Sequence, residues 1–171
     1  MKQNRVWPDV VTFSTAITAC ENGGQTAKAL ALLAEMKLNC VWLDVVPYNA
    51  TIPACETGMQ PAKALELLEE MKQNRVCPDV ITYSAAISAC EKGRETAQAL
   101  ELFSEMKQNR VWPTVITYNA AISACEKGGE TAQALELLAE MKKNRVWPDV
   151  ITYNAAISAC EKGGETAQAL E

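Results

Sequence analysis

The chain has 171 residues, of which 49% are apolar and 22% charged, with a formal net charge of −5 at pH 7. It contains no histidine, which excludes histidine-based acid–base catalysis, metal sites with histidine ligands and the zinc deaminase signature. No apolar run approaches the ~20 residues that a membrane-spanning helix needs, so we expect no membrane partner.

A unit of 35 residues recurs along the chain, and its clearest copy opens with VITYNAAISACEKGGETAQALE at position 115. A fixed period of this size indicates a solenoid, in which each unit packs mainly on its neighbours. We assign a tail of a preceding repeat at 1–9, full repeats at 10–44, 45–79, 80–114 and 115–149, and a truncated repeat at 150–171. Because both ends fall inside a repeat, we expect a segment of a longer array, with any targeting peptide outside it.

The first part of each unit predicts a helix. In the repeat at 115–149, Thr117 is a candidate N-cap. Apolar residues follow at helical spacing, namely Tyr118, Ala121, Ile122 and Cys125. Gly128 and Gly129 then stop the helix and permit a tight turn.

The second part predicts another helix, beginning at about Thr131. The apolar face that we predict for it consists of Ala132, Leu135, Leu138 and Met141. Lys142 and Lys143 complement the helix dipole in the last turn. Asn144 is a candidate left-handed C-cap, and Pro148 prevents continuation.

The repeat at 45–79 departs most from this pattern, because it carries three prolines in addition to the repeat-end Pro78. Pro47 and Pro61 fall near predicted helix starts, where proline is tolerated. Pro53 lies beyond the first turn, where it removes a backbone donor at a cost of about 3 kcal/mol. We therefore predict a kink or break in this helix, which would make this repeat the weakest.

Five of the seven cysteines occupy one repeat position: Cys20, Cys55, Cys90, Cys125 and Cys160. We interpret them as small buried thiols rather than metal or redox groups. No nucleophile–base pair, phosphate-cradling loop or metal cluster stands out, so we expect neither catalysis nor a cofactor.

Tryptophan also recurs near the end of the repeat, at Trp7, Trp42, Trp112 and Trp147, with Cys77 at the same position. We interpret these side chains as packing anchors of the loop between repeats rather than platforms for bases. The nearby arginines are interpreted as solvated loop residues: Arg5, Arg75, Arg110 and Arg145.

A 35-residue hairpin that opens V-[VI]-T-Y-[NS], carries A-C-E-K-G before its turn and ends in Pro-Asp resembles the pentatricopeptide repeat family. The tetratricopeptide repeat is the nearest rival, but its 34-residue period and Trp-Leu-Gly opening are absent. The resemblance implies an all-α fold, an α-solenoid that coils as a right-handed superhelix of stacked helix-turn-helix repeats. It also implies single-stranded RNA as the partner, with one base per repeat.

In that family the fifth and last residues of a repeat select the base. Carried onto this chain, the pairs are Ser14 with Asp44, Asn49 with Asp79, Ser84 with Thr114, and Asn119 with Asp149, while Asn154 lacks a partner. A carboxylate can accept the ring N–H of uracil or guanine, serine leaves room for a purine, and asparagine suits a pyrimidine. The expected tract is G, U, purine, U, pyrimidine, with the third base least specified because Thr114 replaces Asp. The aspartates also have a simpler reading, as caps of the next helix.

The family uses the second residue of a repeat to sandwich bases, which here gives Val11, Val46, Ile81, Ile116 and Ile151. β-Branched packing at a helix start is an equally simple reading, and both can hold. Candidates for phosphate contacts are Lys92, Lys127 and Lys162, although a solvated face explains them as well. The acidic net charge opposes electrostatically driven RNA binding. Part of the negative charge is expected to lie away from the RNA, because the second helix faces away from RNA in this family and carries Glu66, Glu101 and Glu136.

Two alternatives to an RNA-binding segment remain open. The chain could be a helical-repeat scaffold whose groove takes an extended peptide from a protein partner, or the RNA-recognition segment of an enzyme with its catalytic domain elsewhere. Without a polar capping helix, its terminal repeats could also self-associate. The resemblance further implies a chloroplast or mitochondrion and a role in RNA processing or stability, although no residue here specifies an organelle.

Overall fold

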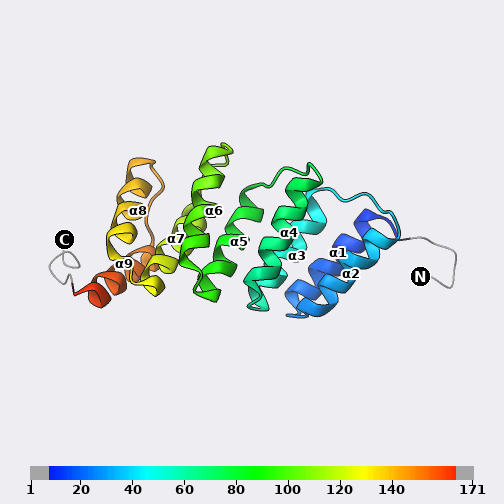
Figure 1. Cartoon of the computed structure of the whole chain (residues 1–171), viewed down its shortest axis with the longest axis horizontal. Helices are drawn as coiled ribbons and strands as arrows, with labels where there is room; N and C mark the ends of the chain where they lie inside the picture. The colour runs from blue at the N-terminus through cyan, green and yellow to red at the C-terminus, as the bar shows by residue number, and fades with distance from the viewer. Residues whose placement is uncertain (1–7, 165–171) are drawn as a thin grey trace.

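A computed structural model describes residues 8–164, and within that range the chain is all-α. The helices are α1 (Val10–Asn22), α2 (Thr26–Leu38), α3 (Val45–Thr57), α4 (Pro61–Gln73), α5 (Val80–Gly93), α6 (Thr96–Gln108), α7 (Val115–Gly128), α8 (Thr131–Lys143) and α9 (Val150–Gly163). The odd-numbered helices begin 35 residues apart, so each complete sequence repeat folds as one helical hairpin (Figure 1). None of the described helices is long and apolar enough to cross a membrane.

The hairpins stack in chain order into a solenoid. Each odd-numbered helix packs against the next odd-numbered helix, and each even-numbered helix packs against the odd-numbered helices on both sides of it. Among the residues described, no two even-numbered helices approach within 8 Å between Cα atoms. The odd-numbered helices therefore form one closely spaced row on the inner side of the array, and the even-numbered helices fan out behind them.

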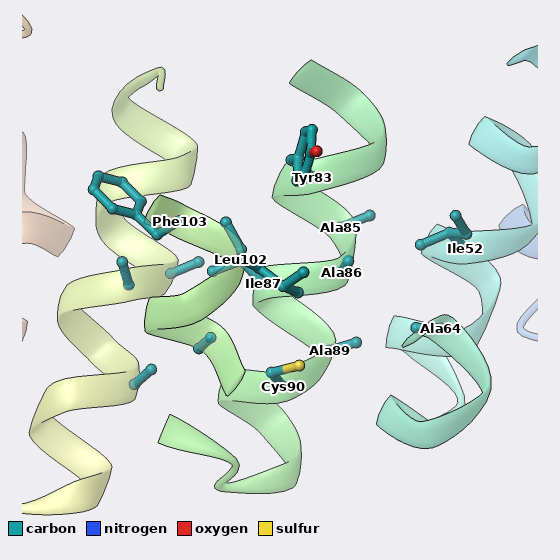
Figure 2. Close-up of a cluster of buried hydrophobic side chains, with 14 of the residues drawn as sticks. Ile52, Ala64, Tyr83, Ala85, Ala86, Ile87, Ala89, Cys90, Leu102 and Phe103 are labelled. Carbon is teal, nitrogen blue, oxygen red and sulfur yellow. The ribbon is translucent and has the colours of Figure 1, made fainter. Parts of the chain in front are cut away.

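The stacked hairpins share one apolar core. Figure 2 shows Tyr83, Ile87 and Cys90 on α5, with Leu102 and Phe103 on the neighbouring α6. The Phe103 ring meets the ring of Tyr118 edge-on, at 5.1 Å between centroids. The face predicted for the first helix of the repeat at 115–149 is confirmed, because Tyr118, Ala121, Ile122 and Cys125 are all fully buried.

The start of that helix was predicted too late. Helix α7 begins at Val115, and Thr114, not Thr117, is its N-cap. Thr117 instead occupies the third helical position, where its hydroxyl accepts a hydrogen bond from the Thr114 N–H at 3.2 Å. A threonine can serve a helix start from either position, so its presence alone does not locate the cap.

The second helix begins at Thr131 as predicted, but its predicted face is partly wrong. Ala132 is exposed, and the buried row is Thr131, Ala134, Leu137 and Met141. The Thr131 hydroxyl donates to the Ala159 carbonyl of the next repeat at 2.8 Å.

The left-handed residue after α8 is Arg145, with φ 58°, and not Asn144. Asn144 keeps φ −81°, and its side-chain amide donates to the Tyr118 hydroxyl at 2.9 Å. The Val146 N–H then bonds to the Met141 carbonyl at 3.0 Å and closes the helix end.

The predicted break at Pro53 does not occur. Helix α3 runs continuously from Val45 to Thr57 with Pro53 inside it. Neighbouring residues Ile52 and Cys55 are fully buried in the shared core. Packing on α1, α4 and α5 holds the helix together across the missing hydrogen bond, because tertiary contacts supply most helix stability in proteins. Pro61 lies at the start of α4, as predicted.

A polar ladder links consecutive even-numbered helices. The buried Tyr83 donates to Glu105 at 2.6 Å and accepts from the Asn109 amide at 2.7 Å. Glu105 also pairs with Lys72 of the preceding repeat at 2.7 Å. The same set recurs as Tyr48, Glu70, Asn74 and Lys37, and as Tyr118, Glu140, Asn144 and Lys107. Each repeat is thus fixed to the one before it by a repeating ion pair.

Adjacent repeats also meet where the odd-numbered helices end. The Thr96 hydroxyl donates to the Ala124 carbonyl of the next repeat at 2.9 Å. A Cβ atom at Gly128 would lie only 2.5 Å from that hydroxyl oxygen, so glycine permits the approach. Gly129 then takes φ 75° and ends the helix, as the Gly-Gly pair predicted.

Candidate nucleic-acid interface

Among the described residues, two of the four pairs predicted to select bases are joined by a hydrogen bond. The Asn49 amide donates to Asp79 at 2.8 Å, although the two residues lie at the fifth and last positions of their repeat. Asn119 donates to both carboxylate oxygens of Asp149, at 3.1 and 3.2 Å. The sequence alone placed these residues only by position, and the stacking of the odd-numbered helices brings them together.

Each of these aspartates also caps the following helix. One oxygen of Asp79 accepts from the backbone N–H groups of Ile81 and Thr82, at 2.9 and 3.0 Å, while its other oxygen accepts from Asn49. The capping role that a simpler reading assigned to these aspartates is therefore present, and the same carboxylate still holds the asparagine.

Backbone hydrogen bonds keep the carboxylate of Asp149 ionised. The N–H of Thr152 lowers the pKa of Asp149 most, and the Asn119 amide adds to this effect. An ionised carboxylate can only accept hydrogen bonds. The Asn119–Asp149 pair therefore offers an acceptor and an amide at one point of the groove.

A threonine that sequence reasoning did not connect with the site completes it. The Thr82 hydroxyl donates to the Asn49 side-chain oxygen at 2.6 Å, and Thr152 makes the same bond to Asn119. Both threonines are fully buried. The signal available in the sequence was their fixed place, two residues before the selecting position of their own repeat.

The two repeats with serine at the fifth position differ from each other in whether a threonine of the next repeat contacts that serine. Ser84 shares a 2.8 Å hydrogen bond with the hydroxyl of Thr117. Ser14 is buried and its hydroxyl has no partner within the described residues. Proline occupies the corresponding place in the next repeat, at Pro47, and has no hydroxyl to offer.

Two hollows open on the inner face, and both belong to serine repeats. The first has a volume of about 490 Å³, and its lining includes Val11, Ser14, Asp44 and Val46. The second has a volume of about 360 Å³, and its lining includes Ile81, Ser84, Thr114 and Ile116. In each hollow, aliphatic side chains of two consecutive repeats flank the two residues that are predicted to select a base.

The aliphatic side chains at the second position form an exposed row along this face. Val11, Val46, Ile81, Ile116 and Ile151 are between 50% and 66% exposed. Exposed β-branched side chains at every repeat are not explained by packing at a helix start. Asn154 is also exposed.

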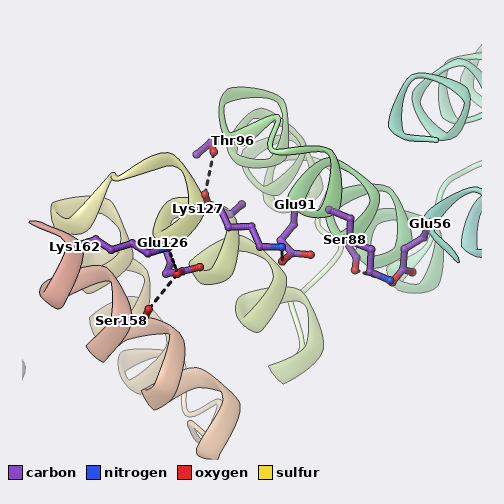
Figure 3. Close-up of polar contacts among 10 residues, drawn as sticks. Glu56, Ser88, Glu91, Thr96, Glu126, Lys127, Ser158 and Lys162 are labelled. Carbon is purple, nitrogen blue, oxygen red and sulfur yellow. Dashed lines mark hydrogen bonds and ion pairs between the residues drawn. The ribbon is translucent and has the colours of Figure 1, made fainter. Parts of the chain in front are cut away.

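The three lysines predicted as candidates for phosphate contacts are each paired with a glutamate of the preceding repeat. Lys92 lies 2.9 Å from Glu56. Lys127 pairs with Glu91, and Lys162 pairs with Glu126 (Figure 3). Since the hydrogen bond from Lys162 lowers the pKa of Glu126, these charges compensate one another beside the groove. Phosphate contacts by Lys92, Lys127 and Lys162 stay a prediction.

The tryptophans were wrongly predicted as packing anchors. Trp42, Trp112 and Trp147 are between 74% and 83% exposed. Pro113 is buried and Val111 packs on the core, so the neighbours of Trp112 anchor this loop. Trp7 and Arg5 lie outside the described residues. Arg75, Arg110 and Arg145 are exposed, as predicted.

The cysteines at the shared repeat position are buried thiols, as predicted, although Cys20 is only half-buried. Burial raises the pKa of Cys55 to about 11 and that of Cys90 to about 12. Cys40 and Cys77 are exposed. Within residues 8–164 no three potential ligands among cysteine, aspartate and glutamate gather in a metal-binding arrangement.

Comparison with known families gives one consistent result. The pentatricopeptide repeat domain profile matches residues 31–92 and 87–128. The profile described as PPR repeat family matches residues 113–162, and the PPR repeat profile matches residues 11–41. Comparison with curated proteins gave no significant match.

Solved structures share the fold. The pentatricopeptide repeat protein PPR10, in complex with an 18-nt psaJ RNA element, superposes over 99% of this chain with a TM-score of 0.79 and 20% identity. A second structure, of PPR10 from maize, superposes over 99% of this chain with a TM-score of 0.74 and 27% identity. This chain spans only about a quarter of the length of PPR10 (25% and 24%). The PPR domain of Arabidopsis thaliana protein-only RNase P 1, in complex with tRNA, superposes with a TM-score of 0.78 and 21% identity. The match covers 91% of this chain and 86% of that domain.

Proposed function

The chain belongs to the pentatricopeptide repeat family, and on that premise we propose that its inner face binds single-stranded RNA, one base per repeat. The observation that carries the proposal is the pairing of Asn49 with Asp79 and of Asn119 with Asp149. These pairs recur at the repeat period and are flanked by exposed aliphatic side chains. PPR10 is a pentatricopeptide repeat protein that has been crystallised with RNA.

The chemistry of the asparagine repeats fits uracil. An ionised carboxylate such as that of Asp149 accepts the N3–H that uracil carries and cytosine lacks. The Asn119 amide retains one N–H beyond the one directed at Asp149, and this N–H can donate to a base oxygen. Val and Ile side chains at the second position contact the base faces and contribute less than the roughly 1–3 kcal/mol per base of an aromatic platform.

The serine repeats suit larger bases. The hollow at Ser14 and the hollow at Ser84, about 490 and 360 Å³, lie where the shorter side chain leaves space. With Asp44 as acceptor, the first repeat selects guanine, and Thr114 leaves the third repeat open to either purine. The whole segment therefore selects the tract G, U, purine, U, pyrimidine, read from 5′ to 3′.

An oligonucleotide panel tests this proposal. We expect the chain to bind RNA with a 5′-GUAUC-3′ core more tightly than a scrambled sequence. Asp149→Asn should change the preferred fourth base from U to C, by about tenfold in relative Kd. Asp79→Asn is the matched control, because it should change the second base and leave the fourth unchanged. An unaltered preference in both variants would reject the assignment.

Salt dependence provides an independent check. With a net charge of −5 and its groove-side lysines already paired, the chain should bind with modest affinity and a shallow salt slope. A fall of about 10³-fold or more in affinity between 50 and 200 mM salt would instead indicate many phosphate contacts. Tight binding to a peptide with no RNA preference would favour the scaffold alternative.

We extend the proposal to transcripts of a chloroplast or mitochondrion, whose processing or stability the protein would support. Family membership alone supports this extension. The segment would supply recognition, and any catalysis would belong to another domain. Imaging of the full-length protein with a fluorescent tag checks the organelle, and nuclease assays of the segment alone should show no cleavage.

A further inference from the structure

Resting on the RNA-binding function proposed above, we infer that the threonine at the third position of a repeat is a positioning residue for the preceding repeat. It orients the base-selecting side chain and so determines which hydrogen-bonding groups face the base. The residues are Thr82 acting on Asn49, Thr117 acting on Ser84, and Thr152 acting on Asn119.

The asparagine amide is held at both ends. Asp79 is a carboxylate that caps α5, so only the amide nitrogen of Asn49 can face it, at 2.8 Å. The Thr82 hydroxyl donates to the amide oxygen at 2.6 Å. A flip of the amide would break both hydrogen bonds, because it would turn oxygen toward the carboxylate and nitrogen toward the hydroxyl proton.

The threonine is itself restrained. Thr82 is fully buried, and its oxygen accepts from the Asp79 N–H at 3.1 Å. A β-branched side chain in a helix has few accessible rotamers. The hydroxyl has two acceptors for its one proton, the Asn49 amide oxygen at 2.6 Å and the Asp79 carboxylate at 3.1 Å, and the shorter contact directs the proton to Asn49. The Asn49 N–H that Asp79 does not take is then left for the ligand. Without this hydroxyl, the amide oxygen would lose its partner and could turn toward the base.

The chain contains an internal contrast. Ser84 is held by Thr117, whereas Ser14 faces a repeat that carries Pro47 at the third position. The buried Ser14 hydroxyl has no partner in the described part of the chain. Pro47 also lacks a backbone N–H, so within residues 8–164 Asp44 accepts only from the N–H of Val46, at 2.9 Å. The first full repeat is therefore the one whose selecting side chain is not held.

The test compares two uridines in one RNA with the core 5′-GUAUC-3′. Thr82→Val should lower the preference for U over C at the second nucleotide by about tenfold. The preference at the fourth nucleotide, which Thr152 still controls, should not change. Thr82→Ser retains the hydroxyl and should restore the wild-type preference. If Thr82→Val lowers the RNA affinity but leaves the preference for U over C unchanged at both nucleotides, Thr82 is only a helix cap and the inference is overturned. No change in either quantity would also overturn it.

A second readout separates this inference from the RNA-binding proposal. In the free protein, ¹⁵N relaxation of the Asn49 side-chain amide should show greater mobility in Thr82→Val, while Asn119 stays rigid. If the wild-type protein does not prefer the core RNA over a scrambled one, the proposed RNA-binding function is wrong. If the Asn49 amide is as rigid in Thr82→Val as in the wild type, the positioning role of Thr82 is wrong. Should Thr82→Val not fold, Pro47→Thr supplies the missing hydroxyl and should increase discrimination of G against A at the first nucleotide. No increase would count against the inference.

Discussion

The buried hydroxyl of Tyr83 should contribute measurably to stability, and Tyr83→Phe removes it without changing the packed ring. In the folded protein this hydroxyl donates to Glu105 at 2.6 Å and accepts from Asn109 at 2.7 Å. Burial raises the pKa of Tyr83 to about 12, so the hydroxyl is protonated and can donate a hydrogen bond at neutral pH.

The expected loss follows from the two bonds. A hydrogen bond to a charged group contributes roughly 1.5–3 kcal/mol, and a neutral one about 0.5–1.5 kcal/mol. Water can partly replace both, because the Glu105 side chain is 30% exposed and Asn109 is exposed. We therefore expect the free energy of unfolding to fall by about 2 kcal/mol, near the lower end of the combined range.

Urea denaturation followed by circular dichroism measures this difference, and Tyr153→Phe is the matched control. Tyr153 occupies the same repeat position but is 43% exposed, and its hydroxyl has no hydrogen-bond partner within residues 8–164. The control should change the free energy of unfolding by less than about 0.5 kcal/mol. Equal effects in the two variants, or a Tyr83→Phe protein as stable as wild type, would refute the assignment of stability to the ladder.

Four further outcomes are expected. Pro53→Ala should raise the melting temperature, because it restores a backbone donor inside a continuous helix; an unchanged melting temperature would mean that packing compensates fully. Trp112→Ala should cost only about 0.5 kcal/mol in urea denaturation, as for other exposed residues, and a loss of 3 kcal/mol would restore its role as an anchor. Mass spectrometry after iodoacetamide treatment at pH 8 should find Cys40 labelled and Cys90 unmodified, since Cys90 is buried with a pKa of about 12; rapid labelling of Cys90 would indicate local opening. Burial raises the pKa of Glu105, but hydrogen bonds and the charge of Lys72 outweigh this effect and lower the pKa below 4.5. The contribution of Glu105 to the free energy of unfolding should therefore be fully present above pH 4.5 and should be lost as the pH falls further. Glu105→Gln should remove this part of the decline in stability at acidic pH.

The repeat period predicted more of the site than any single motif could. The five starting valines lie 35 residues apart, and the helices begin there. Given that register, the resemblance to the pentatricopeptide repeat family pointed to Asn119 and Asp149 by their positions in the repeat. Their hydrogen bond depends on how one hairpin rests on the next, which a repeat length does not specify. The role of Thr82 was missed for the same reason, because its partner Asn49 is 33 residues away in sequence.

The two clearest errors have different physical origins. Pro53 was judged by local propensity, but burial of Ile52 and Cys55 on either side stabilises the helix across the proline. Trp112 was judged by its apolar size, but the loop is anchored by Val111 and Pro113, so the indole is left in solvent. In both cases packing between elements decided the outcome, and composition at one position could not indicate it.

The amino-acid sequence by itself determined the helical hairpin, its period, the buried face of Tyr118 and Ile122, and the family. Periodicity and turn residues act over a few neighbouring positions, so they can be read along the chain. Only the tertiary structure decided which side chains meet across repeats: the Asn–Asp–Thr contacts, the paired lysines, the two hollows and the exposed tryptophans. These contacts arise from the stacking of one hairpin on the next, where shape and hydrogen-bond geometry in three dimensions choose the partners.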